Sequence, residues 1–219
     1  MLFTVASVIA ASAGLSSAAS IPKRDSNGIS VTPHEQYSSS IGALGCKLDT
    51  NRVAYWPESV TCDNICVKVT NGDRSVHLLR VDQSGGAHDI SYDAWNYLVS
   101  GEGASSNPQQ GGGVAMTYEQ VDGDECKDLL TDGKLALSAG NSMNFYASCL
   151  GGDNWVAKNA ELVNIADPTC KYGHDEVCSL DLNTSNQPQC PHMLGSQDAT
   201  DGLTIKNVEY GTGKVYTAL

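Results

Sequence analysis

Short apolar runs alternate with clusters of glycine, asparagine and aspartate along most of this chain, and this pattern is typical of β structure. The clearest example is residues 66–70 (CVKVT), followed by Asn71-Gly72-Asp73 and then by residues 75–82 (SVHLLRVD). An Asn-Gly step supplies the positive φ angles that a tight hairpin needs. This segment therefore predicts two antiparallel strands joined by a short turn.

Other segments extend the same picture. Residues 114–121 (VAMTYEQV) predict a strand, because apolar side chains recur at every second position. Residues 91–99 predict a short helix capped by Ser91, and residues 155–165 a second helical segment. Residues 25–40 are polar and without periodicity, so we expect a flexible lead-in, with ordered structure from Ile41. Many short strands and few helices indicate a mainly β, closed or nearly closed fold.

The N-terminus has the pattern of a secreted precursor. Residues 1–19 are small and apolar and lack charged side chains, as in a signal peptide. Residues 20–24 end in the dibasic pair Lys23-Arg24, which predicts a short propeptide and a mature chain that begins near Asp25. We therefore expect a secreted, extracellular protein.

Cysteine usage agrees with an oxidising compartment. The chain has eight cysteines, an even number, and their spacing lacks the paired CxxC and histidine pattern of zinc sites. We expect four disulfides, no metal and no cofactor, while eight cysteines leave 105 connectivities open. The sequon at Asn183 predicts a glycosylated surface loop. The predicted disulfide residues are Cys46, Cys62, Cys66, Cys126, Cys149, Cys170, Cys178 and Cys190.

Net charge limits the partners. The chain of 219 residues has a formal net charge of −12, whereas nucleic acid and anionic membranes are bound by basic surfaces. We expect neither of these partners. The expectation is instead a monomer that binds a polysaccharide or an extracellular protein, with neutral glycans or a basic protein favoured over anionic polymers.

Three segments, in this order, resemble a known superfamily: VTNGDRSVHLLRVDQ (residues 69–83), GGAHDISYDAWNYL (residues 85–98) and GGGVAMTYEQV (residues 111–121). They are similar to segments of the six-stranded double-psi β-barrel shared by barwin, expansins, loosenins, kiwellins, rare-lipoprotein-A-type lytic transglycosylases and related endoglucanases. The resemblance covers about residues 41–126. Residues 127–219 match no known pattern, and we expect a cysteine-containing extension packed on the barrel or completing it.

The resemblance also indicates candidate catalytic residues. His88-Asp89-Ile90-Ser91 is similar to the segment that carries the general acid of the lytic and hydrolytic members, and Asp82 is similar to a second aspartate near their groove. The cellulose-cleaving members carry a further aspartate where residues 52–62 here contain only Glu58. Hydrolysis needs two flanking carboxyl groups, so this difference favours binding over cleavage. A structural role for Asp89 as a turn-forming residue is the alternative.

Aromatic side chains near the expected groove are candidate sugar contacts. Tyr55, Trp56 and Tyr92, with His88, are the predicted ligand-binding residues, because exposed aromatic rings stack on sugars. Trp95 is instead expected in the core, since it lies on the apolar face of the helix.

Three functions remain open at this level. The first is a fungal, expansin- or barwin-like protein that binds a cell-wall polysaccharide or a host target without cleaving it, in a virulence or effector-type role. The second is a glycan-cleaving enzyme with Asp89 as general acid and Asp82 as the assisting carboxylate. The third is an inhibitor of a secreted enzyme, with the Gly-rich loop of residues 100–113 and the extension as its contact surface.

Overall fold

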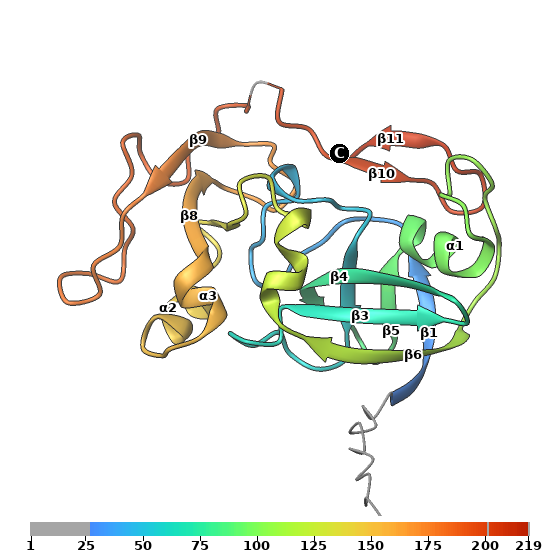
Figure 1. Ribbon diagram of the computed structural model, residues 1–219. Helices are drawn as coiled ribbons and strands as arrows, with labels where there is room; N and C mark the ends of the chain where they lie inside the picture. Colours follow the sequence, from blue (N-terminus) through green and yellow to red (C-terminus); the bar gives the residue numbers. More distant parts are fainter. Residues whose placement is uncertain (1–26, 201, 219) are drawn as a thin grey trace, which may run out of the picture.

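Six strands close into a barrel in the computed structural model, which describes residues 27–200 and 202–218 (Figure 1). The order around the barrel is β1-β5-β2-β4-β3-β6, with β1/β5 and β2/β4 parallel and the remaining neighbours antiparallel. This mixed barrel confirms the predicted mainly β, six-stranded fold. Its strands are β1 (Asn27–His34), β2 (Val53–Trp56), β3 (Cys66–Asn71), β4 (Arg74–Gln83), β5 (His88–Ser91) and β6 (Val114–Val121).

The strongest local prediction is confirmed. Strands β3 and β4 pair from Asn71 and Arg74 outward, so only two residues form the turn. The first of them, Gly72, has a φ angle of +59°, which glycine adopts without the steric cost of a Cβ atom. The turn is therefore Gly72-Asp73, with Asn71 as the last paired residue of β3, and Gly72 supplies the positive φ that the turn needs.

The start of the barrel was not foreseen. Residues 25–40 were expected to be a flexible lead-in, but Asn27–His34 forms β1, which pairs with both β5 and β6. Without β1 the barrel would remain open between those two strands. The polar side chains of β1 concealed it, because an outward-facing strand residue can be polar while its backbone completes the ladder. The predicted signal peptide and propeptide lie outside the described residues.

One helix covers the barrel beside the Gly-rich loop. Helix α1 (Tyr92–Ser100) agrees with the predicted helix, but Ser91 makes no capping bond and its hydroxyl donates to the carbonyl of Asn51. The loop that follows is held in place by Asn96, whose buried amide donates to two loop carbonyls and accepts from the backbone N–H of Gln109. Asn96 therefore ties this loop to helix α1.

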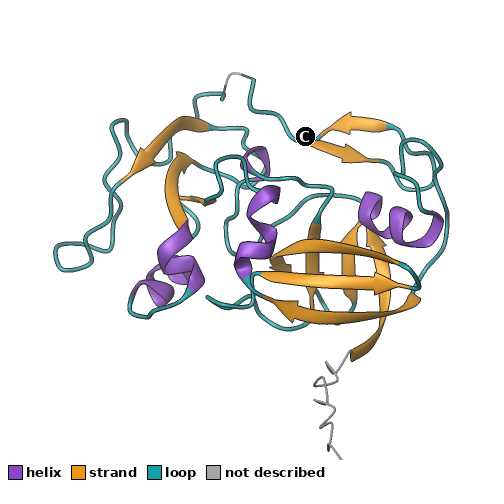
Figure 2. Ribbon diagram, in the orientation of Figure 1, coloured by secondary structure: helices purple, strands orange, loops and turns teal. Residues whose placement is uncertain are grey.

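The extension forms its own layer beside the barrel (Figure 2). A sheet of order β7-β8-β9 and a two-stranded hairpin, β10-β11, carry its strands. The predicted helical segment at residues 155–165 is helical only in its first part and then becomes a strand. The elements of the extension are β7 (Leu135–Ser138), α2 (Met143–Leu150), α3 (Trp155–Asn159), β8 (Ala160–Ile165), β9 (Gly173–Cys178), β10 (Lys206–Val208) and β11 (Val215–Thr217). Two short 3-10 helices precede β7, η1 (Gly45–Lys47) between β1 and β2 and η2 (Gly123–Leu129) after β6.

Barrel and extension share one hydrophobic core. Buried Val53, Leu79 and Val81 of the barrel belong to the same cluster as Leu137 and Leu162 of the extension. All eight cysteines form disulfides, as predicted, and two of the four bonds cross between the two halves. The pairs are Cys46–Cys170, Cys62–Cys149, Cys66–Cys126 and Cys178–Cys190. Among the described residues, no helix has the length and hydropathy needed to cross a membrane.

Candidate functional site

The two predicted catalytic aspartates lie in one row across the barrel wall. Tyr55 of β2 is opposite Asp82 of β4 on one side and opposite Asp89 of β5 on the other, and Asp89 is in turn opposite Thr32 of β1. Residues opposite each other on neighbouring strands share one face of a sheet. The two carboxylates therefore share one face of the barrel wall, with Tyr55 between them.

Both carboxylates are already bonded locally. Asp82 accepts hydrogen bonds from the hydroxyl of Ser38 (2.6 Å) and the backbone N–H of Gln83 (2.8 Å). Asp89 accepts from the hydroxyl of Thr32. Burial raises the pKa of the Tyr55 phenol, and the negative charges of the two aspartates raise it further. Tyr55 is therefore a neutral, buried group, and each aspartate beside it accepts at least one local hydrogen bond.

His88 faces the other way from its neighbour Asp89. Consecutive strand residues point to opposite faces, and the His88 ring lies 5.1 Å from the ring of Trp56. The Tyr118 ring lies 4.5 Å from Trp56 at an angle of 73°. The His-Asp segment thus places its two side chains at two separate sites, and His88 belongs to the aromatic group formed with Trp56 and Tyr118.

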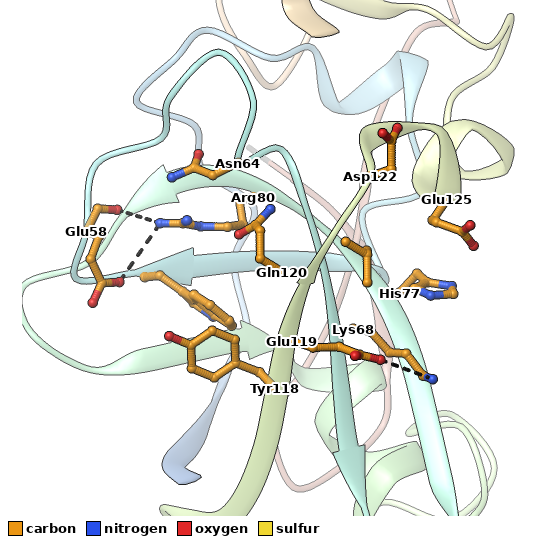
Figure 3. Close-up of a pocket in the computed structure, with 12 residues that line it drawn as sticks. Glu58, Asn64, Lys68, His77, Arg80, Tyr118, Glu119, Gln120, Asp122 and Glu125 are labelled. Carbon is orange, nitrogen blue, oxygen red and sulfur yellow. Dashed lines mark hydrogen bonds and ion pairs between the residues drawn. The ribbon is translucent and has the colours of Figure 1, made fainter. Parts of the chain in front are cut away.

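This aromatic group borders a hollow of about 950 Å³ (Figure 3). The hollow extends over both sides of β6, because its lining includes consecutive residues of that strand. We call the part at the end of the barrel the groove. Its lining residues are Trp56, Glu58, Asn64, Arg80, Tyr118 and Gln120, and the other part is lined by Lys68, His77, Glu119, Val121, Asp122 and Glu125.

Arg80 is the unusual residue of the groove. Its side chain is only 5% exposed, its guanidinium lies 5.1 Å above the Trp56 ring, and its Nη2 donates to the carbonyl of Glu58. The carboxylate of Glu58 is 3.9 Å away and largely exposed, so it compensates the buried charge weakly. Burial accordingly lowers the pKa of Arg80. The Nε of Arg80 and the Nε1 of Trp56 are buried and have no hydrogen-bond partner within the described structure.

The three predicted ligand-binding aromatics are buried. Tyr55 is 3% exposed, and Trp56 and Tyr92 are each 1% exposed, so none of them offers an open ring face in this structure. The hydroxyl of Tyr92 donates to the carbonyl of Gln109 and accepts from the N–H of Gly211, which ties the Gly-rich loop to the C-terminal hairpin. Trp95 is buried and donates to the carbonyl of Val31, in agreement with its predicted core position.

The sequence interpretation missed most of the groove. Arg80 is a charged residue inside the apolar run Leu78-Leu79-Arg80-Val81, and that interruption was the available signal. Tyr118 shares one face of its predicted strand with Val114 and Met116, but nothing in the neighbouring sequence indicated a groove. Asn64 and Gln120 carried no signal, since they reach the site only through the folding of distant strands.

Metal binding finds no support in the geometry of the described residues. No group of three or more histidine, cysteine, aspartate or glutamate side chains there is arranged to hold a metal ion. The predicted glycosylation site, Asn183, lies in an exposed loop of the extension, and its amide donates to Asp181.

Comparisons with known proteins concern the barrel. No protein-family model matches the chain, and no curated protein sequence matches it. The solution structure of the fungal elicitor cerato-platanin is similar, with 21% identity and a TM-score of 0.36 over 46% of this chain and 98% of that chain. The crystal structure of cerato-platanin 3 from M. perniciosa is 14% identical, with a TM-score of 0.33 over 46% of this chain and 99% of that chain. The crystal structure of cerato-platanin 2 from M. perniciosa is 13% identical, with a TM-score of 0.32 over 43% of this chain and 94% of that chain. This chain is thus similar to cerato-platanins over less than half of its length.

Proposed function

We propose that this protein is a secreted, cell-wall-directed binding protein that holds a neutral polysaccharide in the groove at the end of the barrel without cleaving it. The observation that carries the proposal is the composition of the groove. It combines the half-buried ring of Tyr118 with the planar polar side chains of Glu58, Asn64, Arg80 and Gln120.

These side chains suit a sugar. An aromatic ring stacks on the apolar face of a pyranose, while amide, guanidinium and carboxylate groups are matched to its hydroxyls as donors and acceptors. The unpaired N–H groups of Trp56 and Arg80 add two donors at the same place, which a small side-chain movement would make available. Opposite charges line the groove together, so we propose a neutral ligand rather than an anionic polymer.

Binding without cleavage is proposed because the groove lacks a matched acid pair. Glycoside hydrolysis uses two carboxyl groups about 5 to 9.5 Å apart on either side of the scissile bond. Glu58 is the carboxylate at the barrel end, and it lies beside Arg80, whereas Asp82 and Asp89 do not line the groove. Four disulfides support the secreted location, since such bonds persist in oxidising compartments.

Titration calorimetry with cello-, xylo-, laminari- and chito-oligosaccharides tests the proposal. We expect binding to at least one neutral series and a loss of about tenfold or more for Tyr118→Ala, since one stacking contact contributes about 1 to 3 kcal/mol. Tyr172→Ala is the matched control, because Tyr172 is exposed on the extension, far along the chain from the groove residues. No binding to any series, or equal losses for both variants, would contradict the proposal.

Cleavage is the second candidate, and the convergence of Asp82 and Asp89 on Tyr55 is the observation that favours it. The same oligosaccharides and the corresponding polymers are incubated with wild type and Asp89→Asn, and new reducing ends and anhydro products are measured. Product formation that depends on Asp89 would replace the binding proposal with an enzymatic one.

A further inference from the structure

Exposed apolar side chains are concentrated on one part of the extension. Six large apolar side chains are exposed among the described residues, and four of them lie between Tyr172 and Met193. Val177 is 60% exposed and Met193 is 80% exposed. We call residues 172–193 the β9 arm. Figure 1 shows that the loop following β9 projects away from the rest of the molecule. Exposed apolar side chains that gather on one segment, unlike single scattered ones, mark an interaction surface.

The β9 arm is held in a fixed shape. Cys178 and Cys190 form a disulfide, and next to it Ser179 and Gln189 exchange two backbone hydrogen bonds of 2.9 and 2.8 Å. On the same arm, Glu176 accepts from both the backbone N–H and the ring of His192. A rigid segment loses little conformational entropy on binding, so exposed side chains on it can contribute their full apolar area to a complex.

A second hollow, of about 430 Å³, opens beside β9. Its lining includes four consecutive residues of the strand, Gly173 to Glu176, whose side chains alternate between faces, so it follows the edge of the strand. The opposite wall comes from His192 and from Ala199, Thr200 and Leu203. Within the hollow the rings of His174 and His192 stack with centroids 4.2 Å apart.

Charge selects the kind of partner. Residues 171–200 contain one lysine against four carboxylates, which are Asp175, Glu176, Asp181 and Asp198. The whole chain has a net charge of −12, so a second copy would bring like charge to this surface. A positively charged segment is attracted to it, and apolar residues in that segment would cover Val177 and Met193.

We propose that the hollow beside β9 and the flanking side chains of Val177 and Met193 bind an extended segment of a protein partner that carries lysine or arginine next to apolar residues. The cationic side chain enters the hollow beside the carboxylate of Glu176, one of the residues that line it. The neighbouring apolar residues cover Val177 and Met193. This site shares no lining residue with the groove of the barrel, so the proposal does not depend on polysaccharide binding.

The test uses a phage-displayed library of random dodecapeptides selected against the full mature chain. The enriched peptides are synthesised, and their affinities are measured by fluorescence anisotropy for wild type, for the double variant Val177→Ser/Met193→Ser and for Val215→Ser. Val215 is the matched control, since it is exposed on β11, outside the β9 arm. Circular dichroism verifies that each variant is folded.

We expect enriched peptides that combine basic and apolar residues and bind the double variant at least tenfold more weakly, while Val215→Ser leaves binding unchanged. Amide chemical-shift changes on binding should fall within residues 171–203. The proposal is overturned if no peptide is enriched above background, if the enriched peptides are acidic or bind all variants equally, or if shift changes map to the groove. Self-association in sedimentation that the double variant abolishes would assign the surface to a second copy and overturn it as well.

Discussion

Replacing Arg80 by methionine should leave the free energy of unfolding nearly unchanged and weaken ligand binding in the groove. In the folded protein the guanidinium makes one hydrogen bond to the carbonyl of Glu58 and lies above the Trp56 ring. Losing a charged hydrogen bond costs about 1.5 to 3 kcal/mol, and losing the cation–π contact about 1 kcal/mol. The variant also removes a buried, unpartnered N–H and a weakly compensated charge, which raises the free energy of unfolding by about 2 to 4 kcal/mol.

These terms nearly cancel, so the free energy of unfolding of Arg80→Met should lie within about 1 kcal/mol of wild type. Binding in the groove should behave differently. If Arg80 donates to the ligand, losing that donor costs about 1.5 to 3 kcal/mol, which is about 10- to 150-fold in affinity.

Urea unfolding followed by tryptophan fluorescence and calorimetry with the best oligosaccharide provide the two measurements. Arg74→Met is the control, because Arg74 donates to the carbonyls of Leu98 and Val99 at the end of α1 and does not line the groove. It should lose about 1 to 2 kcal/mol of stability and keep its affinity. A loss above about 3 kcal/mol for Arg80→Met with unchanged affinity would refute the reasoning and make Arg80 a structural residue.

Three further predictions concern residues outside the groove. Asn96→Ala should lower the free energy of unfolding by about 3 kcal/mol, measured by urea unfolding, because the buried amide of Asn96 makes three hydrogen bonds to the loop backbone. Partial burial alone would raise the pKa of Glu176, but hydrogen bonds from His192 and Asn164 outweigh it and lower the pKa to about 2. Wild type should therefore be more stable than Glu176→Gln above about pH 4.5. In unfolding measurements this difference in the free energy of unfolding should vanish towards about pH 2. Peptide N-glycosidase should reduce the mass of protein secreted from a eukaryotic host, and Ser185→Ala, which removes the hydroxyl residue of the sequon, should abolish that shift.

The barrel was accessible from the sequence because its strongest signals are local. The hairpin at Gly72, the strand at residues 114–121 and the helix after Ser91 all depend on neighbours in the chain, and each is present in the structure. Strand β1 was missed because its position is decided by two distant partners, β5 and β6, rather than by its own pattern. Tertiary pairing of this kind overrides a weak local preference.

The groove was less accessible than the fold. Its residues come from β2, β4, β6 and the loops before β3, and no single segment carries more than a few of them. Asp82 and Asp89 attracted attention through motif similarity, yet the register places them beside Tyr55 and away from the groove. A motif fixes which residues are neighbours in the chain, whereas the strand register decides which side of the wall each one faces.

The two disulfides that cross between the halves, Cys46–Cys170 and Cys62–Cys149, have a consequence for how the molecule resists proteases. A cut in the chain between residues 127 and 148 would leave two fragments still joined by both bonds and by the shared core. Such a cut therefore does not release the barrel from the extension. A chain cross-linked in this way can be cut between residues 127 and 148 and still hold its groove and its β9 arm in one molecule.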